Sequence, residues 1–139
     1  MSQKNINHIE KLVEEIGKRS NNKRFVVAVS GFAGAGKSTI SGKLASILKN
    51  SLVIHVDDFI IADENGAKPG YPHDWENFER LVLSKLRDAP KVTSRTFDWK
   101  SNKIVDESIE VQRYIVVDGP SELFQDAFSQ YLDLLVWVD

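Results

Sequence analysis

The residues best suited to chemistry lie between positions 31 and 39, where glycines, a lysine and hydroxyl side chains follow closely. From Gly31 to Ser38 they fit the spacing G-x-x-x-x-G-K-[ST] of a phosphate-binding P-loop. Glycines let the backbone curl, so that successive N–H groups point at one anion. Lys37 would reach the β- and γ-phosphates, and the Ser38 hydroxyl would hold Mg²⁺. The predicted nucleotide contacts are Gly31, Ala33, Gly34, Ala35, Gly36, Lys37, Ser38 and Thr39.

The segments on either side of this loop match the context that the motif requires. Residues 25–29 are apolar and mostly β-branched, which predicts a buried strand. Residues 39–48 predict a helix with one apolar face, made of Ile40, Leu44, Ile47 and Leu48. The alternative is a Gly-rich turn that binds nothing, and the strand–loop–helix order counts against it.

Carboxylates follow two other predicted strands. Residues 52–56 predict a buried strand that leads into Asp57 and Asp58, and residues 114–119 predict another that ends at Asp118. Ligands of open α/β sheets bind at the carboxyl ends of strands, so we expect these carboxylates at the site. The competing interpretation of the Asp57–Asp58 pair is a turn or helix cap. His55, inside its strand, is interpreted as a core histidine.

The remaining segments complete an alternating pattern. Residues 5–18, within an N-terminal segment of residues 1–22, predict an amphipathic helix, and Asp74 caps a predicted helix over 75–87. Residues 91–98 and 103–110 predict a hairpin outside the main sheet. A helix should follow Pro120, and residues 134–138 predict a fourth strand. The expected apolar face of the helix after Pro120 is Leu123, Phe124, Ala127 and Phe128.

Strands alternating with helices predict one α/β domain over 1–139, with a mainly parallel, doubly wound sheet. The chain has 139 residues and a formal net charge of −2 with acids and bases interspersed, which argues against a nucleic-acid surface. There is no cysteine, and no apolar run approaches the ~18 residues of a membrane span. We therefore expect a cytoplasmic protein without nucleic-acid or membrane partners.

Several stretches together resemble the uridine kinase-like branch of small-molecule P-loop kinases, which includes nicotinamide riboside kinases and phosphoribulokinase. The order of the matches along the chain supports this resemblance more than any single match. They are residues 31–39, 56–59, 71–78, 97–99, 115–119 and 133–139.

The resemblance implies a P-loop NTPase fold with strand order 2-3-1-4 and transfer of the ATP γ-phosphate to a hydroxyl of a small acceptor. Asp57 matches the family's catalytic base, and Ser38 and Asp118 match its Mg²⁺ side. A carboxylate within ~3 Å of an alcohol can take or orient its proton as it attacks. Metal contact is expected from Ser38, Asp57 and Asp118, and acceptor contact from Asp58, Asp74, Trp75, Phe97 and Trp99, although core packing is an equal alternative for the aromatic residues.

The chain also departs from the family pattern. Asp118 stands where the family usually has Glu, and Phe97 and Asn102 stand where uridine kinases use Tyr and His on the pyrimidine. We therefore expect an acceptor other than uridine or cytidine. The family continues past the fourth strand into an arginine-bearing lid, so we expect an incomplete kinase that self-associates through the edge strand 134–138. The alternatives are a P-loop ATPase or a non-catalytic nucleotide-binding protein.

Overall fold

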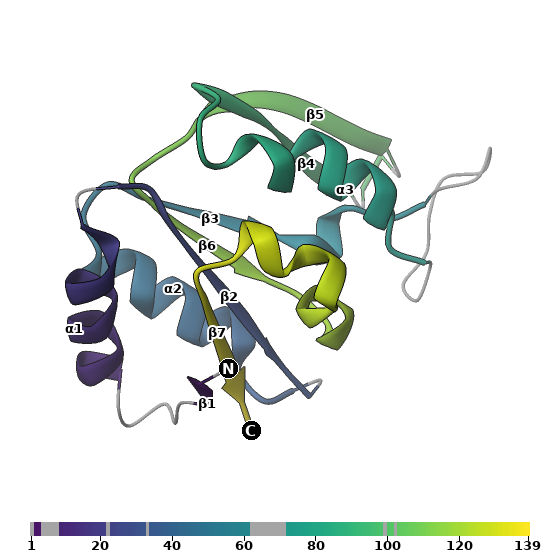
Figure 1. The fold of residues 1–139 in the computed structure, drawn as a ribbon. Helices are drawn as coiled ribbons and strands as arrows, with labels where there is room; N and C mark the ends of the chain where they lie inside the picture. The colour runs from purple at the N-terminus through teal and green to yellow at the C-terminus, as the bar shows by residue number, and fades with distance from the viewer. Residues whose placement is uncertain are drawn as a thin grey trace.

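The computed structural model describes residues 2–3, 9–21, 23–32, 34–61, 72–98, 100–101 and 103–139, and the side chains of 2, 3 and 97 are left aside. Five strands form the main sheet, in which every pairing is parallel (Figure 1). This confirms the expected α/β architecture with a parallel sheet. The strand order is β1 (Ser2–Gln3), β7 (Leu134–Val138), β2 (Phe25–Gly31), β6 (Tyr114–Asp118) and β3 (Ser51–His55).

The strand that leads into the P-loop, β2, lies in the middle of this sheet. All seven of its residues are buried, because it pairs with β6 on one side and β7 on the other. A parallel strand covered on both faces is expected to be a continuous apolar run, and β2 and β6 are such runs. The P-loop therefore starts from a buried strand that is paired on both sides.

The edge of the sheet differs from the expectation. The strand at 134–138 was expected at the edge, but the short strand β1 pairs with it, with Ser2 opposite Val136 and Gln3 opposite Trp137. A fifth strand is therefore present, and β7 is an inner strand. Self-association through β7 stays a prediction, but its basis was a bare edge, and β1 occupies that edge.

Two helices, α1 (Ile9–Ser20) and α2 (Lys37–Ile47), cover one face of the sheet (Figure 1). Leu12 and Ile16 of α1 pack with Ile40 and Leu44 of α2 over alternate residues of β2 and β7. The predicted apolar face of α2 is wrong at Ile47, which is 48% exposed. The stripe is centred nearer Leu44 and Leu48, which turns Ile47 to solvent and buries Ser41 completely.

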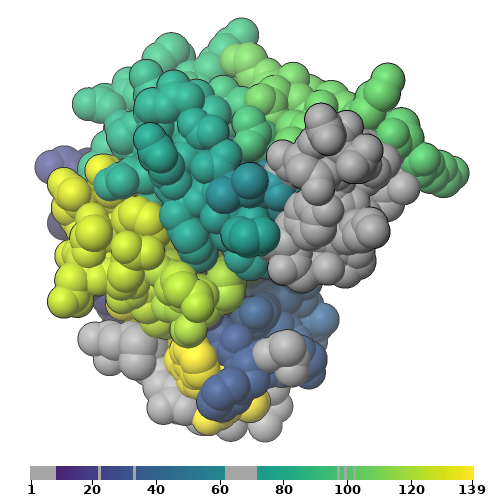
Figure 2. Space-filling model, turned by 90° about the vertical axis from the view of Figure 1, so that its right-hand side faces the viewer, coloured from purple at the N-terminus to yellow at the C-terminus, as the bar shows by residue number. Residues whose placement is uncertain are grey.

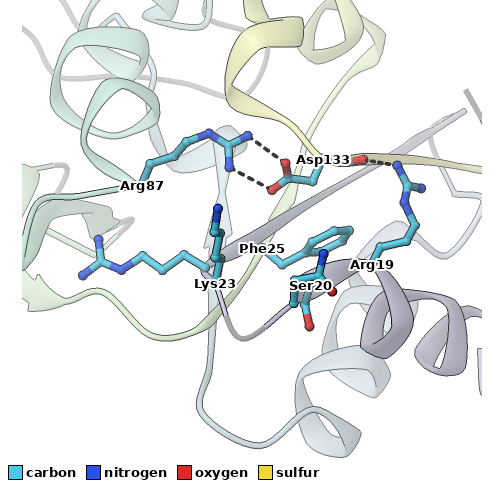
Figure 3. A pocket seen from close by; sticks show the side chains of 8 residues that line it. Arg19, Ser20, Lys23, Phe25, Arg87 and Asp133 are labelled. Atoms are coloured by element: carbon cyan, nitrogen blue, oxygen red, sulfur yellow. Dashed lines mark hydrogen bonds and ion pairs between the residues drawn. The ribbon is translucent and has the colours of Figure 1, made fainter.

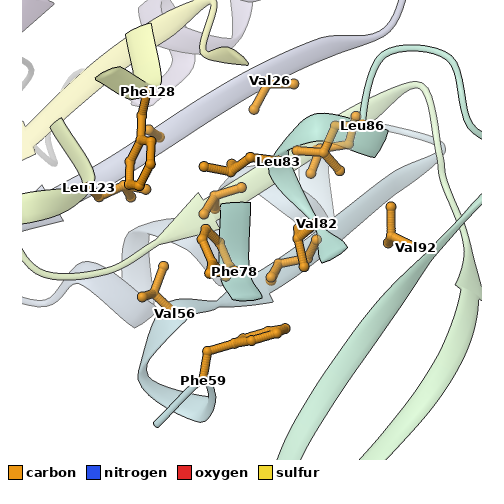
Figure 4. Close-up of a cluster of buried hydrophobic side chains, with 14 residues drawn as sticks. Val26, Val56, Phe59, Phe78, Val82, Leu83, Leu86, Val92, Leu123 and Phe128 are labelled. Atoms are coloured by element: carbon orange, nitrogen blue, oxygen red, sulfur yellow. The ribbon is translucent and has the colours of Figure 1, made fainter. Parts of the chain in front are cut away.

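The other face carries α3 (Trp75–Leu81), the 3₁₀ turn η3 (Leu83–Lys85), and the hairpin of β4 (Lys91–Asp98) and β5 (Lys103–Glu110). Beside them lie two 3₁₀ helices, η4 (Ser121–Phe124) and η5 (Asp126–Tyr131). Their side chains form one core cluster with β2, β3 and β6 (Figure 4). Its most buried members include Val26, Phe59, Phe78, Val82, Leu83, Leu86, Ile115 and Leu123.

Two predicted helices on this face are wrong in extent or type. The helix predicted over 75–87 ends at Leu81, because Val82 turns to φ −119°, ψ −72° and the next turn is 3₁₀. This turn brings Val82, Leu83 and Leu86 into the core together. No α-helix follows Pro120, since Gln125 is extended at φ −64°, ψ 149° between two short 3₁₀ segments. Consequently Ala127, expected on the apolar face, is exposed.

The hairpin has the predicted bounds and lies outside the main sheet. Arg95 of β4 attaches it to the body of the protein. Its guanidinium pairs with Asp106 of β5 at 2.8 Å and with Asp74 at 3.6 Å, and lies over the Phe59 ring. In the part of the chain that is described, no helix is long and apolar enough to cross a membrane.

Candidate active site

The P-loop forms an open concave surface at the carboxyl end of β2. Gly34 and Gly36 have positive φ angles of 80° and 95°, which side-chain-bearing residues rarely adopt. The helix α2 begins at Lys37, so its first N–H groups and its dipole face the same space. A cavity of about 290 Å³ is lined by Gly34, Gly36, Lys37, Ser38 and Thr39. These five predicted residues therefore surround a space suited to phosphate, whereas Ala33 lies outside the described residues.

The first glycine of the motif has a different role. A Cβ at Gly31 would collide with the carbonyl oxygen of Val138, because β2 and β7 pair closely at this point. The next residue, Phe32, is 68% exposed and meets the Trp137 ring edge-on at 5.3 Å between centroids. Glycine is therefore required at position 31 by the close approach of β7, where the chain passes from β2 into the P-loop. A positive φ angle is not the reason.

The three candidate carboxylates gather at the same edge of the sheet. The register places Asp118, the last residue of β6, between Val29 of β2 and His55 of β3. Asp57 and Asp58 follow directly in the 3₁₀ turn η2 (Val56–Asp58). The topology therefore agrees with the expectation that these carboxylates lie on the P-loop side of the sheet.

His55 does not lie in the core as predicted. Its side chain is 45% exposed, and its Nδ1 lies 2.8 Å from Oδ2 of Asp118, which is itself only 4% exposed. The hydrogen bond that His55 donates to Asp118 raises the pKa of His55 most, burial opposes this, and the charges of Asp118, Asp58 and Asp57 raise it further. His55 thus binds directly to the predicted metal-side carboxylate Asp118.

Asp57 and Asp58 have different surroundings. The Asp57 side chain is 70% exposed, and its Oδ1 lies 2.9 Å from Nε2 of His73. Asp58 is half-buried, and burial raises its pKa most, while His55 lowers the pKa and the charges of Asp57 and Asp118 raise it. Three carboxylates are therefore close enough to repel one another.

This set of side chains fits Mg²⁺ by its chemistry. Carboxylate and hydroxyl oxygens are the ligands that Mg²⁺ prefers, and it commonly takes one or two carboxylates together with nucleotide phosphates. The repulsion among Asp57, Asp58 and Asp118 is the kind that a bound cation relieves. Within the described ranges, no three acidic or histidine side chains form a metal cluster. The arrangement therefore fits a metal shared with a nucleotide, with Ser38 as the hydroxyl ligand.

The predicted acceptor residues have different surroundings in the structure. Asp74 caps α3, since Oδ1 accepts from the Asn77 backbone N–H at 3.2 Å and Oδ2 from the Asn77 amide at 2.7 Å. Trp75 is partly buried and packs against Phe78 and Phe128 at 6.0 and 5.6 Å between ring centroids, which favours the packing alternative. The Phe97 side chain and Trp99 lie outside the described residues.

Arg80, Arg95 and Arg113 each have a partner away from the P-loop. Arg80 donates to Asn77 Oδ1 at 2.7 Å, and Arg95 is held by Asp106 and Asp74. Arg113 lies over the Tyr114 ring and donates to Ser20 Oγ, at the opposite end of the sheet. None of these contacts brings a guanidinium to the P-loop.

A larger cavity of about 440 Å³ lies at that opposite end, beside Arg19, Lys23, Phe25 and Asp133 (Figure 3). Arg87 binds both carboxylate oxygens of Asp133 at 2.8 and 3.1 Å, and Arg19 donates to the Asp133 carbonyl. These bonds connect α1 with the segment after η3 and with the residue that precedes β7, at the amino ends of the strands. Ligands of open α/β sheets bind at the other end, so we place the site at the P-loop.

Two site residues were missed by sequence reasoning, His55 and His73. A signal for His55 existed, because it ends its strand just as Asp118 ends the neighbouring one. His73 carried no such signal, since it reaches Asp57 across a loop whose residues 62–71 lie outside the described part.

Figure 2 shows the P-loop segment in blue, α3 in teal and the 3₁₀ helices in yellow-green on one face.

The fold and the site define an α/β protein with a P-loop at the carboxyl end of its central strand. No protein-family model matches the chain. It is 29% identical over 86 residues to uridine-cytidine kinase C of Dictyostelium discoideum, and 22% identical over 123 residues to the uridine kinase of Borrelia duttonii. These matches cover 56% and 82% of this chain, but only 19% and 60% of the two relatives.

Solved structures give the same class. A Bacillus stearothermophilus protein described as a possible uridine kinase superposes with a TM-score of 0.81 at 19% identity, covering 96% of this chain and 80% of that one. A D-glycerate 3-kinase from Cryptococcus neoformans superposes with a TM-score of 0.50 at 18% identity, covering 81% and 49%. The resemblance to uridine kinases and related P-loop kinases is therefore confirmed, and at these identities the structures establish the fold.

Proposed function

We propose that the chain transfers the γ-phosphate of ATP to a hydroxyl group of a small acceptor, as an ATP- and Mg²⁺-dependent kinase of the uridine kinase type. One observation carries the proposal. The strand order places Asp118 beside the strand that bears the P-loop, and the Asp57–Asp58 turn one strand further along the same sheet edge. A phosphate cradle and a row of carboxylates at one sheet edge are the parts that phosphoryl transfer needs.

The residues have distinct proposed roles. The backbone from Gly34 to Lys37 and the Lys37 ammonium hold the phosphates, and Ser38 and Asp118 hold Mg²⁺, which would neutralise charge on the phosphates. Asp57 accepts the proton of the attacking hydroxyl. Its exposure of 70% suits this role, because a base must be reachable by a substrate.

The acceptor is proposed to be nucleoside-like or sugar-like, and not uridine or cytidine. Support for the first part comes from the names of the similar kinases. Support for the second comes from Phe97, which has no hydroxyl with which to read a pyrimidine. A pocket without hydrogen-bonding partners cannot provide the large discrimination that buried hydrogen bonds give.

The deciding experiment is a screen of nucleosides, sugars and vitamins for acceptor-stimulated ADP release, with Asp57→Asn as the matched inactive control. Stimulation by an acceptor in the wild type, lost in the variant, supports the kinase. ADP release that no acceptor changes supports an ATPase, and ATP binding without turnover supports a nucleotide-binding protein. The last outcome has some basis, since Arg80, Arg95 and Arg113 all have partners away from the P-loop.

A further inference from the structure

The proposed base Asp57 is poorly restrained by its own surroundings. It lies in a short 3₁₀ turn after β3, and 70% of its side chain is exposed. An exposed carboxylate can rotate among several rotamers, and most of them would not face a substrate hydroxyl. Efficient general-base catalysis needs the carboxylate held within hydrogen-bond reach of that hydroxyl. Some other group must therefore fix its orientation.

His73 is positioned to do this. Its Nε2 lies 2.9 Å from Oδ1 of Asp57, which leaves Oδ2 for a substrate proton. An ionised carboxylate can only accept, so in this bond Nε2 carries the hydrogen and donates it. His73 comes from the segment before α3, and Asp57 from the end of β3, so the bond joins two separate elements.

The imidazole is itself held by backbone and ring contacts. His73 forms an isolated antiparallel bridge with Ile60, and the flanking bonds are Asp74 N–H to Phe59 O at 2.7 Å and Ile61 N–H to Pro72 O at 2.8 Å. Its ring lies 5.7 Å from that of Trp75. With 27% of its side chain exposed, against 70% for Asp57, His73 is the more enclosed of the two side chains.

Trp75 continues this support into the core. It meets Phe78, which is fully buried, and Phe128, which is 3% exposed. A continuous line of contacts therefore runs from the core through Trp75 and His73 to Asp57. This explains why Trp75, expected against the acceptor, packs inward: its ring supports the residue that touches the carboxylate.

We propose that His73 is a positioning residue that orients the catalytic base Asp57 through the Nε2–Oδ1 hydrogen bond. The positioning role of His73 rests on the proposed kinase function, because that role requires Asp57 to act as a base. The Nε2–Oδ1 contact does not depend on that function. Two variants separate the hydrogen bond from the ring. His73→Phe keeps a ring against Trp75 and removes the donor, whereas His73→Gln restores an N–H donor near the position of Nε2.

The first experiment is independent of activity. Long-range ¹H–¹⁵N NMR of the imidazoles at about pH 8.5, above the ordinary histidine pKa, reports which ring nitrogen carries hydrogen. We expect the Nε2–H tautomer for His73 in the wild-type chain and in Asp58→Ala. A free neutral histidine already favours Nε2–H, so the decisive signal is the chemical shift of the bonded Nε2–H. In Asp57→Ala that shift should move to the value of a solvated imidazole, and in Asp58→Ala it should stay. An Nε2–H shift unchanged in Asp57→Ala would overturn the proposal, because the carboxylate would then not be bonded to the imidazole.

The second experiment measures phosphoryl transfer with an acceptor found in the screen. His73→Phe should lower kcat roughly ten- to hundredfold while leaving the KM for ATP unchanged, and His73→Gln should recover most of the loss. A wild-type kcat in His73→Phe would overturn the positioning role. If the wild type itself transfers phosphate to no acceptor, the proposed function fails and the role with it, and the NMR result still decides whether the His73–Asp57 pair exists.

Discussion

The Nδ1 atom of His55 lies 2.8 Å from Oδ2 of Asp118, across the paired strands β3 and β6. This bond raises the pKa of His55 above its ordinary 6.5 more than burial lowers it. A group whose pKa is raised by folding stabilises the protein in its protonated form. That stabilisation is fully present below pH 6.5 and is lost as the pH rises through the folded-state pKa.

The first prediction follows from this sign. His55→Gln should destabilise the chain relative to wild type at about pH 5.5 and much less at about pH 8.5. Urea unfolding of both proteins at the two pH values measures the difference. Since the His55 side chain is 45% exposed, we expect a small effect. A difference in unfolding free energy that does not change with pH would show that the pair does not stabilise the fold through charge.

The second prediction concerns the phosphate cradle. Lys37→Ala removes a charged contact to phosphate and should weaken ATP binding by roughly 1.5–3 kcal/mol. Titration calorimetry in the presence of Mg²⁺ measures this. Lys43→Ala is the matched control, because Lys43 is an exposed lysine of the same helix α2. Equal affinity in the two variants would remove the P-loop assignment.

The third prediction separates the adjacent carboxylates. Asp57→Asn should abolish phosphoryl transfer with little effect on ATP binding, because it removes the proton acceptor and keeps the shape. Asp58→Asn should retain transfer, because Asp58 is half-buried and a substrate hydroxyl reaches it less readily than it reaches the exposed Asp57. Coupled ADP-release assays decide. An active Asp57→Asn beside a dead Asp58→Asn would reverse the assignment.

The fourth prediction tests the core on the α3 face. Phe78 is fully buried and meets Phe59 edge-on at 5.0 Å between ring centroids. Phe78→Ala should therefore cost about 3–5 kcal/mol of unfolding free energy, measured by urea denaturation. Phe32→Ala is the control, because Phe32 is 68% exposed, and its cost should stay below about 1 kcal/mol. Similar costs for both would contradict the packing described.

The fifth prediction is a gain in stability. Ser41 is completely buried in α2, and among the described residues its Oγ has no hydrogen-bond partner. Removing an unsatisfied buried hydroxyl, together with the better helix propensity of alanine, should stabilise Ser41→Ala by about 1 kcal/mol. A thermal unfolding scan shows this as a higher Tm. A clear loss of stability would mean that the hydroxyl has a partner, such as water.

Much of the fold could be predicted, because the P-loop and the strand patterns are local. Residues 25–31 and 114–118 are largely apolar runs whatever they pair with, and the extended segments 91–98 and 103–110 are close enough in sequence to pair as a hairpin. What failed depended on tertiary context. The helix predicted after Pro120 is interrupted at Gln125, and the buried face of α2 does not include Ile47. In both places packing against the sheet outweighs the hydrophobic periodicity of the sequence.

The site was predicted only in part, because some of its residues belong to a local motif and others are brought together by tertiary structure. Gly34, Gly36 and Lys37 follow from a motif, whereas the partners of Asp57 and Asp118 follow from strand register. A sequence shows that His55 and His73 can donate hydrogen bonds, but not which carboxylate each one meets. The second edge strand β1 was missed because two residues carry no periodic pattern.

The central position of β2 also determines the order in which the chain can assemble. Both neighbours of this strand come from the last quarter of the sequence, β6 at Tyr114–Asp118 and β7 at Leu134–Val138. The P-loop strand is thus synthesised early and has no described partner strand until those segments have left the ribosome. Pairings this distant in sequence make folding slow, because a large loop must close before any contact compensates for it. The nucleotide site is therefore a late product of folding, although its motif lies near the start of the chain.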